Sequence, residues 1–375
     1  VDAGGAQLAV YLHGRLVVDL WAGQDPIGDQ PYTGDSVSVL MSVSKGLVAT
    51  CVHLLGQRGL LDVEAPVGEY WPTFTANGKD RITIADLLSH RAGLNGFDPE
   101  SGIGIGEMLD WDRCVTSLGN MAPLWTPGSA YQYHPFTHGY LLGEVVRRVT
   151  GITVGQFFAD EIAGPLGLDL WIGLPESEEH RFVRQFSEWH PHTLAEAAQE
   201  LAESGADPTS RLGRAVANNT VIGDDCVDGL NTRAAHVAEV PAAGGIGNAR
   251  SLAKMYAATI GEIDGLRLLT PETVDRARTP QTDKLGPPPP FDEIPEPQPM
   301  RFGLGYDLPR PAIPEFGEGS FGHAGAGGRV GFAHPERGIA VGYTCTNMLW
   351  DPAAGPDDRW MPWTVALHDI VNATA

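Results

Sequence analysis

Apolar and polar residues alternate loosely near the start of the chain. The alternation covers 7–12 and 15–21, and His13-Gly14 between them fits a tight turn, so the pattern predicts a β-hairpin. A short apolar stretch over 37–41 then leads into the first strongly helical pattern. We therefore expect the chain to open with strands.

The middle of the chain is patterned mainly as helices. From Ser42 onward, apolar residues recur every three or four positions, which predicts a helix that begins at Ser42 and ends near Gly59. Residues 190–218 are rich in Ala and Glu and have high helix propensity. Other helices are expected at 80–93, 139–150, 151–166 and 251–260.

The last part of the chain returns to strand-like patterns. Residues 286–300 contain four consecutive prolines and predict a stiff surface loop. After this loop, strands are expected at 302–308, 328–333 and 338–344, and a final helix at 363–371.

Strands at both ends of a helical middle predict an α/β (α+β) protein in which both chain ends contribute to one layer. We expect a sheet flanked by helices, with a mostly helical region inserted into the chain. The predicted division places an α/β domain in 1–75 and 240–375 and a helical domain in 76–239. The chain has 375 residues, 42% of them hydrophobic, which is enough for a sizeable core.

Charge and composition exclude several classes of protein. The formal net charge of −22 repels polyanions, so a nucleic-acid partner is not expected. No run of about 18 apolar residues is present, so we expect no membrane-spanning helix. The N-terminus shows no leader-like pattern, and a cytoplasmic location is expected. The sequence leaves the oligomeric state open.

The cysteines and histidines predict no metal or redox site. Cys51, Cys114, Cys226 and Cys345 form no Cys-x-x-Cys pair, so buried free thiols are expected. The scattered histidines show no convincing metal-ligand spacing. We therefore expect neither a metal ion nor another cofactor.

The segment Ser42-Val43-Ser44-Lys45 opens the first predicted helix and carries candidate chemistry. A serine at a helix start lies near unpaired backbone N–H groups, which favour developing negative charge. A lysine three residues later lies one turn on, on the same face. If partly desolvated, its amine loses its proton more easily and can activate the hydroxyl. A bare Ser-x-x-Lys is also common as a capped helix with a solvated lysine.

Two further segments could join this pair. Tyr133 follows a turn at Pro127-Gly128, and a phenol beside a lysine ammonium can have a lowered pKa and shuttle protons. His323 opens a glycine-rich segment that ends at Gly328, and such a segment lets the backbone approach a ligand closely. Taken alone, the tyrosine fits a packed aromatic and the histidine fits a surface residue.

In this order, the three segments resemble the motifs of the serine β-lactamase, penicillin-binding protein and related esterase superfamily. The resemblance covers nearly the whole chain from residue 7 onward and implies an antiparallel sheet flanked by helices. Supporting stretches that are similar to the family are Leu87–Leu94, Trp125–Gly128, Gly244–Gly247 and Phe302–Tyr306.

The resemblance also implies a role for each motif residue. Ser42 would attack an acyl carbonyl, while Lys45 and Tyr133 take its proton and Tyr133 passes one to the leaving group. The backbone N–H groups of Ser42 and Ala326 would form the oxyanion hole. The implied substrate-binding residues are His323, Ala324 and Gly325.

Two departures from the family pattern concern the substrate. The related β-lactamases usually have Asn two residues after the tyrosine, where this chain has Pro135. They also usually have Lys at the position of His323, which is mostly neutral at pH 7. Arg329 is a candidate replacement cation. Both departures point away from penicillins and D-Ala-D-Ala peptides and towards neutral esters or lactones. No Glu can be assigned as a separate deacylation base, so the arrangement resembles class C and esterase members more than class A.

We therefore expect a cofactor-independent hydrolase of small-molecule carboxylic esters. Acyl transfer to an alcohol or amine remains an alternative, as does amide hydrolysis of the D-aminopeptidase or β-lactamase type. A non-catalytic binding protein on the same scaffold is the alternative from another class. Intact Ser42, Lys45 and Tyr133 argue against that alternative.

Overall fold

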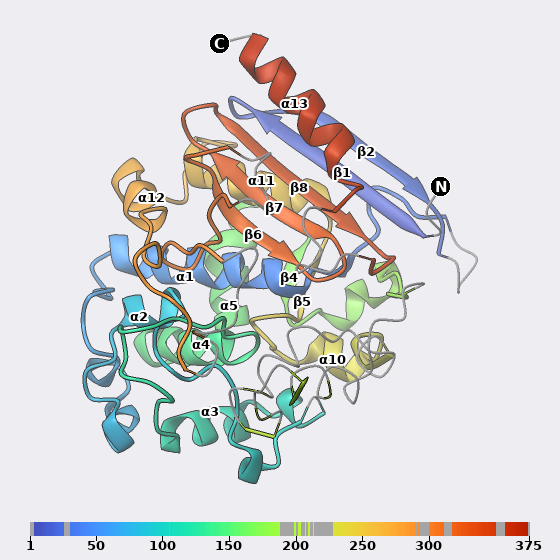
Figure 1. Ribbon diagram of the computed structural model, residues 1–375. Coiled ribbons are helices and arrows are strands. Elements are labelled where there is room, and N and C mark those ends of the chain that lie inside the picture. The colour runs from blue at the N-terminus through green and yellow to red at the C-terminus, as the bar shows by residue number, and fades with distance from the viewer. Residues whose placement is uncertain are drawn as a thin grey trace.

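A five-stranded antiparallel sheet forms one layer of the computed structural model (Figure 1). β1 pairs with its hairpin partner β2 on one side and with β8 on the other, so Val10 lies between Val18 and Val341. The strand order is β2 (Arg15–Gly23), β1 (Gly5–Leu12), β8 (Ile339–Cys345), β7 (Arg329–His334) and β6 (Phe321–Gly325). Both ends of the chain thus build one sheet.

The structure describes most of the chain. The described residues are 4–25, 31–104, 106–187, 228–289, 300–310, 317–349 and 357–373, with isolated positions between 199 and 213 and at 292. The predicted helix at 190–218 and the predicted loop at 286–300 lie largely outside these residues.

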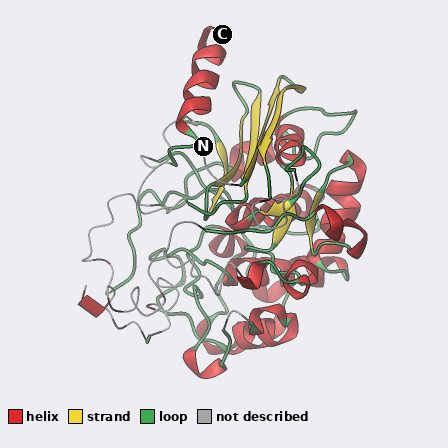
Figure 2. Cartoon of the chain, turned by 90° about the vertical axis from the view of Figure 1, so that its right-hand side faces the viewer, coloured by secondary structure: helices red, strands yellow, loops and turns green. Residues whose placement is uncertain are grey.

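Helices cover both faces of the sheet. α11 (Ala249–Ile260) packs on one face, where Gly342 allows close contact because a Cβ there would lie 2.3 Å from the Ala249 carbonyl oxygen. Side chains alternate between the two faces of a strand, so Val341 and Tyr343 point the other way. There they pack with α13 (Met361–Ala373), which Figures 1 and 2 show on the opposite side of the sheet.

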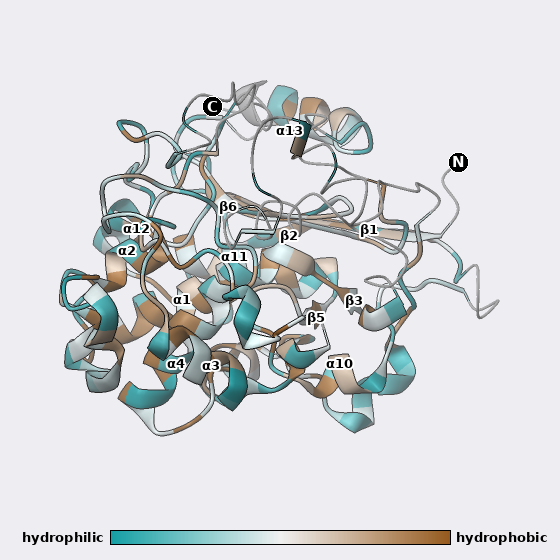
Figure 3. Ribbon diagram, turned by 60° about the horizontal axis from the view of Figure 1, so that its bottom comes forward, coloured by the Kyte–Doolittle hydropathy of each residue, from teal (hydrophilic) through white to brown (hydrophobic). Residues whose placement is uncertain are grey.

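The other helices group around α1 (Ser44–Gln57), as Figure 3 shows. Every α1 residue from Ser44 to Leu55 is buried, and α1 contacts α4, α5 and β6. The helices of this layer are α2 (Ile84–Leu88), α3 (Trp111–Asn120), α4 (Thr137–Thr150), α5 (Val154–Phe158), α6 (Gly164–Leu166), α10 (Arg233–Val237) and α12 (Pro271–Ala277). Short 3-10 turns lie at Met41–Val43, Val67–Glu69, Pro72–Gly78, Pro99–Ser101, Glu107–Leu109 and Glu176–Arg181, and a π turn at Ala159–Ala163.

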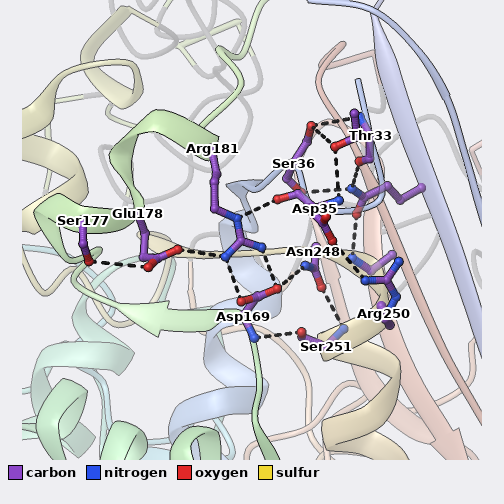
Figure 4. Close-up of polar contacts among 12 residues, drawn as sticks. Thr33, Asp35, Ser36, Asp169, Ser177, Glu178, Arg181, Asn248, Arg250 and Ser251 are labelled. Carbon is purple, nitrogen blue, oxygen red and sulfur yellow. Dashed lines mark hydrogen bonds and ion pairs between the residues drawn. The ribbon is translucent and has the colours of Figure 1, made fainter. Parts of the chain in front are cut away.

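A second antiparallel sheet lies beside the start of α1. Its order is β3 (Ser38–Val39), β5 (Gly245–Gly247) and β4 (Leu170–Ile172). Figure 4 shows the polar network at its edge, where the Arg181 guanidinium donates two hydrogen bonds of 2.6 and 2.9 Å to the Asp169 carboxylate. Asn248 also donates to Asp169 and accepts from the Ser251 N–H as the N-cap of α11. The network therefore joins the start of β4 to the start of α11.

The observed architecture confirms the predicted α/β class with an antiparallel sheet flanked by helices. The hairpin and the strands predicted at 328–333 and 338–344 are present within two residues of their expected bounds. The predicted division into 1–75 with 240–375 and 76–239 stays a prediction.

Three local predictions were wrong. The first α-helix begins at Ser44, because Ser42 lies in a preceding 3-10 turn. The helix expected over 80–93 is limited to α2, since the Thr83 cap starts it late and it ends before His90, which is left-handed. The segment 302–308 is a turn rather than a strand, because Gly305 has a φ of +85°.

Candidate active site

Ser42 lies in the 3-10 turn that directly precedes α1. Met41 before it has a left-handed backbone with φ of +50°, which is uncommon for a residue with a side chain. Met41 and Val43 are buried, whereas Ser42 is partly exposed. The Leu40 N–H donates to the Gly245 carbonyl at 2.8 Å and holds the turn against β5. The Ser42 hydroxyl is therefore presented by a turn whose neighbours are anchored in the core.

Lys45 is fully buried, and its amine contacts three oxygens. Nζ lies 3.1 Å from Ser42 Oγ, 2.7 Å from the Pro135 carbonyl oxygen and 2.9 Å from the Ala242 carbonyl oxygen. Burial lowers the pKa of Lys45 well below the usual lysine value, because the charged form loses its hydration. Carbonyl oxygens only accept, so they take both N–H groups of a neutral amine. In that form, the lone pair would be directed at the Ser42 hydroxyl oxygen 3.1 Å away.

Tyr133 packs beside the same amine. Lys45 Nζ lies 4.7 Å from the centroid of the Tyr133 ring. The expectation of a lowered pKa was wrong: burial raises the pKa of Tyr133, and a hydrogen bond with the Ser42 side chain offsets only part of this effect. The phenol therefore keeps its proton at neutral pH and is suited to donating it.

The strand β6 forms the edge of the large sheet. The backbone N–H and C=O of Gly322 bond with Asp307, on the side away from β7. The direction of backbone hydrogen bonds alternates along a strand, so those of Ala324 point to the same side. The Gly322 groups are taken by Asp307 and the Ala324 carbonyl by the His323 ring, so the Ala324 N–H is the group of this edge that could donate to a substrate carbonyl.

Gly325 sets the distance between β6 and the Ser42 turn. A Cβ on Gly325 would lie 2.5 Å from the Leu40 carbonyl oxygen and 3.3 Å from the Ser42 nitrogen. The Gly325 carbonyl accepts from the Gly328 N–H at 3.1 Å across the β6–β7 turn. The N–H and C=O of a trans peptide point in opposite directions, so the Ala326 N–H points out of that turn. The predicted oxyanion-hole residues, Ser42 and Ala326, thus lie on adjoining segments.

His323 is buried and neutral. Its Nδ1 lies 2.6 Å from the Ala324 carbonyl oxygen, and its ring centroid is 6.2 Å from that of Tyr133. Burial, followed by the charge of Lys45, lowers the pKa of His323 to about 3. With the proton on Nδ1, the unprotonated Nε2 has no hydrogen-bond partner among the described residues and can accept one from a ligand.

Three carbonyls of the β6–β7 turn are each held by a side chain. The donors are Arg329 to Ala326 at 3.1 Å, Arg359 to Gly327 at 2.8 Å and Trp360 to Gly328 at 2.9 Å. Arg329 is fully buried and also donates to the Val39 carbonyl and to Gln185. Arg329 therefore supports the turn, and its candidate role as a substrate-binding cation is wrong.

Sequence reasoning missed the carbonyls of Pro135 and Ala242 that hold Lys45. In the sequence, Pro135 stands out only because the family usually has an Asn at this position. Its backbone carbonyl could not be singled out, because every residue has one. Sequence reasoning also gave no role to His90, whose ring lies 4.9 Å from that of Tyr133. The only available signal for His90 was its place in the Leu87–Leu94 stretch.

Other expectations concern metals, cysteines and membranes. No group of three or more His, Cys, Asp or Glu within the described residues could hold a metal ion. In the same part of the chain, no helix is both long and apolar enough to cross a membrane. Cys51, Cys114 and Cys345 are buried and free, as expected, while Cys226 lies outside the described residues.

Comparison with known proteins identifies the family. The chain matches the Beta-lactamase family over residues 1–361 and belongs to it. It is 36% identical over 366 residues to the esterase/beta-lactamase LipL of Mycobacterium tuberculosis, covering 92% of this chain and 78% of LipL. The structure of EstA from Arthrobacter nitroguajacolicus Rue61a is 32% identical, with a TM-score of 0.81 over 99% of this chain and 93% of EstA. A family VIII carboxylesterase is 31% identical, with a TM-score of 0.76 over 96% and 90% of the two chains.

Proposed function

We propose that this protein is a serine hydrolase that cleaves carboxylic esters through an acyl-enzyme on Ser42. The observation that carries the proposal is the buried Lys45 amine, which lies 3.1 Å from Ser42 Oγ and whose other hydrogen-bond partners among the described residues are two backbone carbonyls. A serine hydroxyl is a weak nucleophile until an adjacent base takes its proton. Ester chemistry is supported by the names of LipL, an esterase/beta-lactamase, and of the family VIII carboxylesterase.

In the first half of the reaction, Lys45 takes the Ser42 proton as Oγ bonds to the ester carbonyl carbon. The N–H groups of Ser42 and Ala326 donate to the oxyanion. Tyr133 gives its phenolic proton to the departing alkoxide, so an alcohol leaves, and the Lys45 ammonium returns a proton to the Tyr133 oxygen. The product of this half is an ester between the acyl group and Ser42.

In the second half, water replaces the alcohol. Its oxygen bonds to the acyl carbon while Lys45 takes one of its protons, and the same oxyanion hole stabilises the charge. The bond between Ser42 Oγ and the acyl carbon breaks, Oγ takes the proton back, and a carboxylic acid leaves.

A neutral ester fits the site better than a β-lactam or a peptide carboxylate. His323 is neutral, because burial lowers its pKa to about 3, and Arg329 is bonded to backbone carbonyls and Gln185. Arg310 lies 3.6 Å from the Asp307 carboxylate. Pro135 adds no side-chain donor. A substrate with its own negative charge would therefore find no unpaired cation among these residues.

The test is hydrolysis of p-nitrophenyl esters from acetate to decanoate, beside nitrocefin, by the wild type and Ser42→Ala. We expect ester turnover in the wild type, its loss in Ser42→Ala, and little nitrocefin cleavage by either. Rapid nitrocefin turnover with little ester cleavage would replace the proposal with a β-lactamase. Full ester turnover by Ser42→Ala would reject the Ser42 mechanism.

A further inference from the structure

His90 connects the end of α2 to the loop that carries Tyr133. It is 1% exposed and has a left-handed backbone with φ of +62°. Its carbonyl accepts from the Gln132 N–H at 3.2 Å, and its Nδ1 accepts from the His134 N–H at 3.1 Å. The residues before and after Tyr133 are therefore both bonded to one residue, through its backbone and its ring.

The same ring packs against the phenol. The His90 centroid lies 4.9 Å from that of Tyr133 and 4.3 Å from that of Phe302. The Tyr133 and Phe302 rings are nearly parallel, with an interplanar angle of 3° and centroids 5.9 Å apart. Backbone bonds and ring contacts thus restrict both the position of Tyr133 and the direction of its hydroxyl.

The side chain of His134 adds further hydrogen bonds between this loop and the chain that follows His90. The Leu94 N–H donates to Nε2 of His134, and Nδ1 of His134 bonds the Gln132 carbonyl. One residue further on, the Pro135 carbonyl accepts from Lys45 at 2.7 Å. A shift of this loop would therefore move the Tyr133 phenol and one of the two carbonyls that orient Lys45.

The role requires one protonation state of the imidazole. Nδ1 accepts a hydrogen bond, so the ring proton of a neutral His90 lies on Nε2. Burial, followed by the neighbouring His138, lowers the pKa of His90 well below its usual value and keeps this neutral form.

We propose that His90 is a positioning residue for Tyr133, and that its essential feature is a hydrogen-bond acceptor at Nδ1 on a left-handed backbone. The inference rests on the proposed proton transfer by Tyr133. His90 touches neither substrate nor reacting atoms in this account, and acts by holding the loop that bears them.

Three substitutions of His90 test whether the acceptor at Nδ1 is the essential feature. Asn places Oδ1 where His has Nδ1 and tolerates a left-handed backbone, whereas Gln and Ala lack an acceptor at that point. His53→Asn is the matched control, since His53 is also buried and bonds the Leu304 carbonyl at 2.8 Å, outside this loop. Thermal unfolding of every variant identifies any that fail to fold.

The readouts are kcat and KM for an alkyl ester. Misplacement of a catalytic group by about 1 Å can cost about 10²-fold, so we expect His90→Gln and His90→Ala to lose about that factor in kcat with KM little changed, and His90→Asn to stay within about tenfold of wild type. In a Tyr133→Phe background, His90→Gln should cause a clearly smaller loss than in the wild type, because the Tyr133 contribution is already gone and only the effect through the Pro135 carbonyl and Lys45 remains.

Two comparisons between variants can overturn the role of His90. The first is an equal loss in His90→Asn and His90→Gln, and the second is an undiminished effect of His90→Gln in the Tyr133→Phe background. Loss of turnover in Ser42→Ala with full activity in His90→Gln would reject this inference alone. Full turnover in Ser42→Ala would reject the proposed function and this inference together.

Discussion

The Lys45 amine lies 3.1 Å from the Ser42 hydroxyl oxygen, and its two other hydrogen bonds go to backbone carbonyls. Burial lowers the pKa of Lys45 and favours the neutral amine, in which the two carbonyls take both N–H groups and the lone pair can accept the Ser42 proton. A solvated lysine at the same spacing would stay charged and could only donate. The burial of Lys45, rather than its presence three residues after Ser42, is what gives the pair its proposed chemistry.

The pH dependence of ester hydrolysis should follow Lys45. The reactive form is the neutral amine, so kcat/KM rises with pH as Lys45 loses its proton. Burial lowers the pKa of Lys45, so this rise should be complete well below the ordinary lysine value of about 10.4. The measurement is kcat/KM against pH with a p-nitrophenyl ester. Activity that appears only near the ordinary lysine pKa would contradict a neutral base.

Lys45→Arg should be inactive at every pH at which the wild type is active, because a guanidinium stays protonated and cannot accept the Ser42 proton. Lys254→Arg is the matched control, since Lys254 bonds the Leu166 carbonyl and pairs with Asp264 away from the site. We expect wild-type kcat in this control.

Tyr133→Phe should show a loss that depends on the leaving group. Alkoxides need a proton as they depart, whereas p-nitrophenolate leaves without one. A positioned general acid contributes about 10²–10⁴-fold, so we expect a loss in that range for an ethyl ester and a much smaller one for the p-nitrophenyl ester of the same acid. Equal losses for the two esters would show that Tyr133 does not protonate the leaving group.

Gly325→Ala should disturb the proposed oxyanion hole between β6 and the Ser42 turn. The new Cβ would lie 2.5 Å from the Leu40 carbonyl oxygen, so β6 or the Ser42 turn must move. Loss of one oxyanion donor costs about 10²–10³-fold in kcat, and we expect a loss of this order. Gly106→Ala is the control, because its Cβ meets no atom within 4 Å. If the two variants have the same kcat, close contact at Gly325 is unimportant for catalysis.

Arg359→Lys should weaken stabilisation of the transition state. The guanidinium bonds the carbonyls of Gly327 and Asn347 and pairs with Asp357, and a lysine cannot reproduce this fork. We expect lower kcat and, by a similar factor, weaker inhibition by a boronic acid that mimics the tetrahedral intermediate. Arg276→Lys serves as an exposed control. Unchanged inhibition in Arg359→Lys would mean that the β6–β7 turn keeps its conformation without the Arg359 guanidinium.

The sequence predicts the parts of the site that depend on residue type and local spacing. Helical spacing makes Ser42 and Lys45 a candidate pair, whereas the roles predicted for Tyr133 and His323 come from the resemblance of the three ordered segments to the family motifs. The sheet was predictable for a similar reason, since alternation over 7–12 and 15–21 is a local signal.

Effects that arise from burial or from distant backbone groups could not be predicted in this way. The raised pKa of Tyr133 comes from desolvation, which a sequence does not show. The carbonyls of Pro135 and Ala242 reach Lys45 across 90 and 197 residues of chain, and any residue type supplies such a group. Arg329 was a plausible substrate cation until its burial and its hydrogen bonds to Val39, Ala326 and Gln185 were known.

The most direct test of the central claim is to identify the acylated residue. The wild type is mixed with p-nitrophenyl butyrate, quenched in acid within the first turnover, digested and analysed by mass spectrometry. We predict one butyryl group on the peptide that contains Ser42, and none in Ser42→Ala or Lys45→Arg. A butyryl group on another residue, or ester turnover with no covalent adduct, would contradict the account.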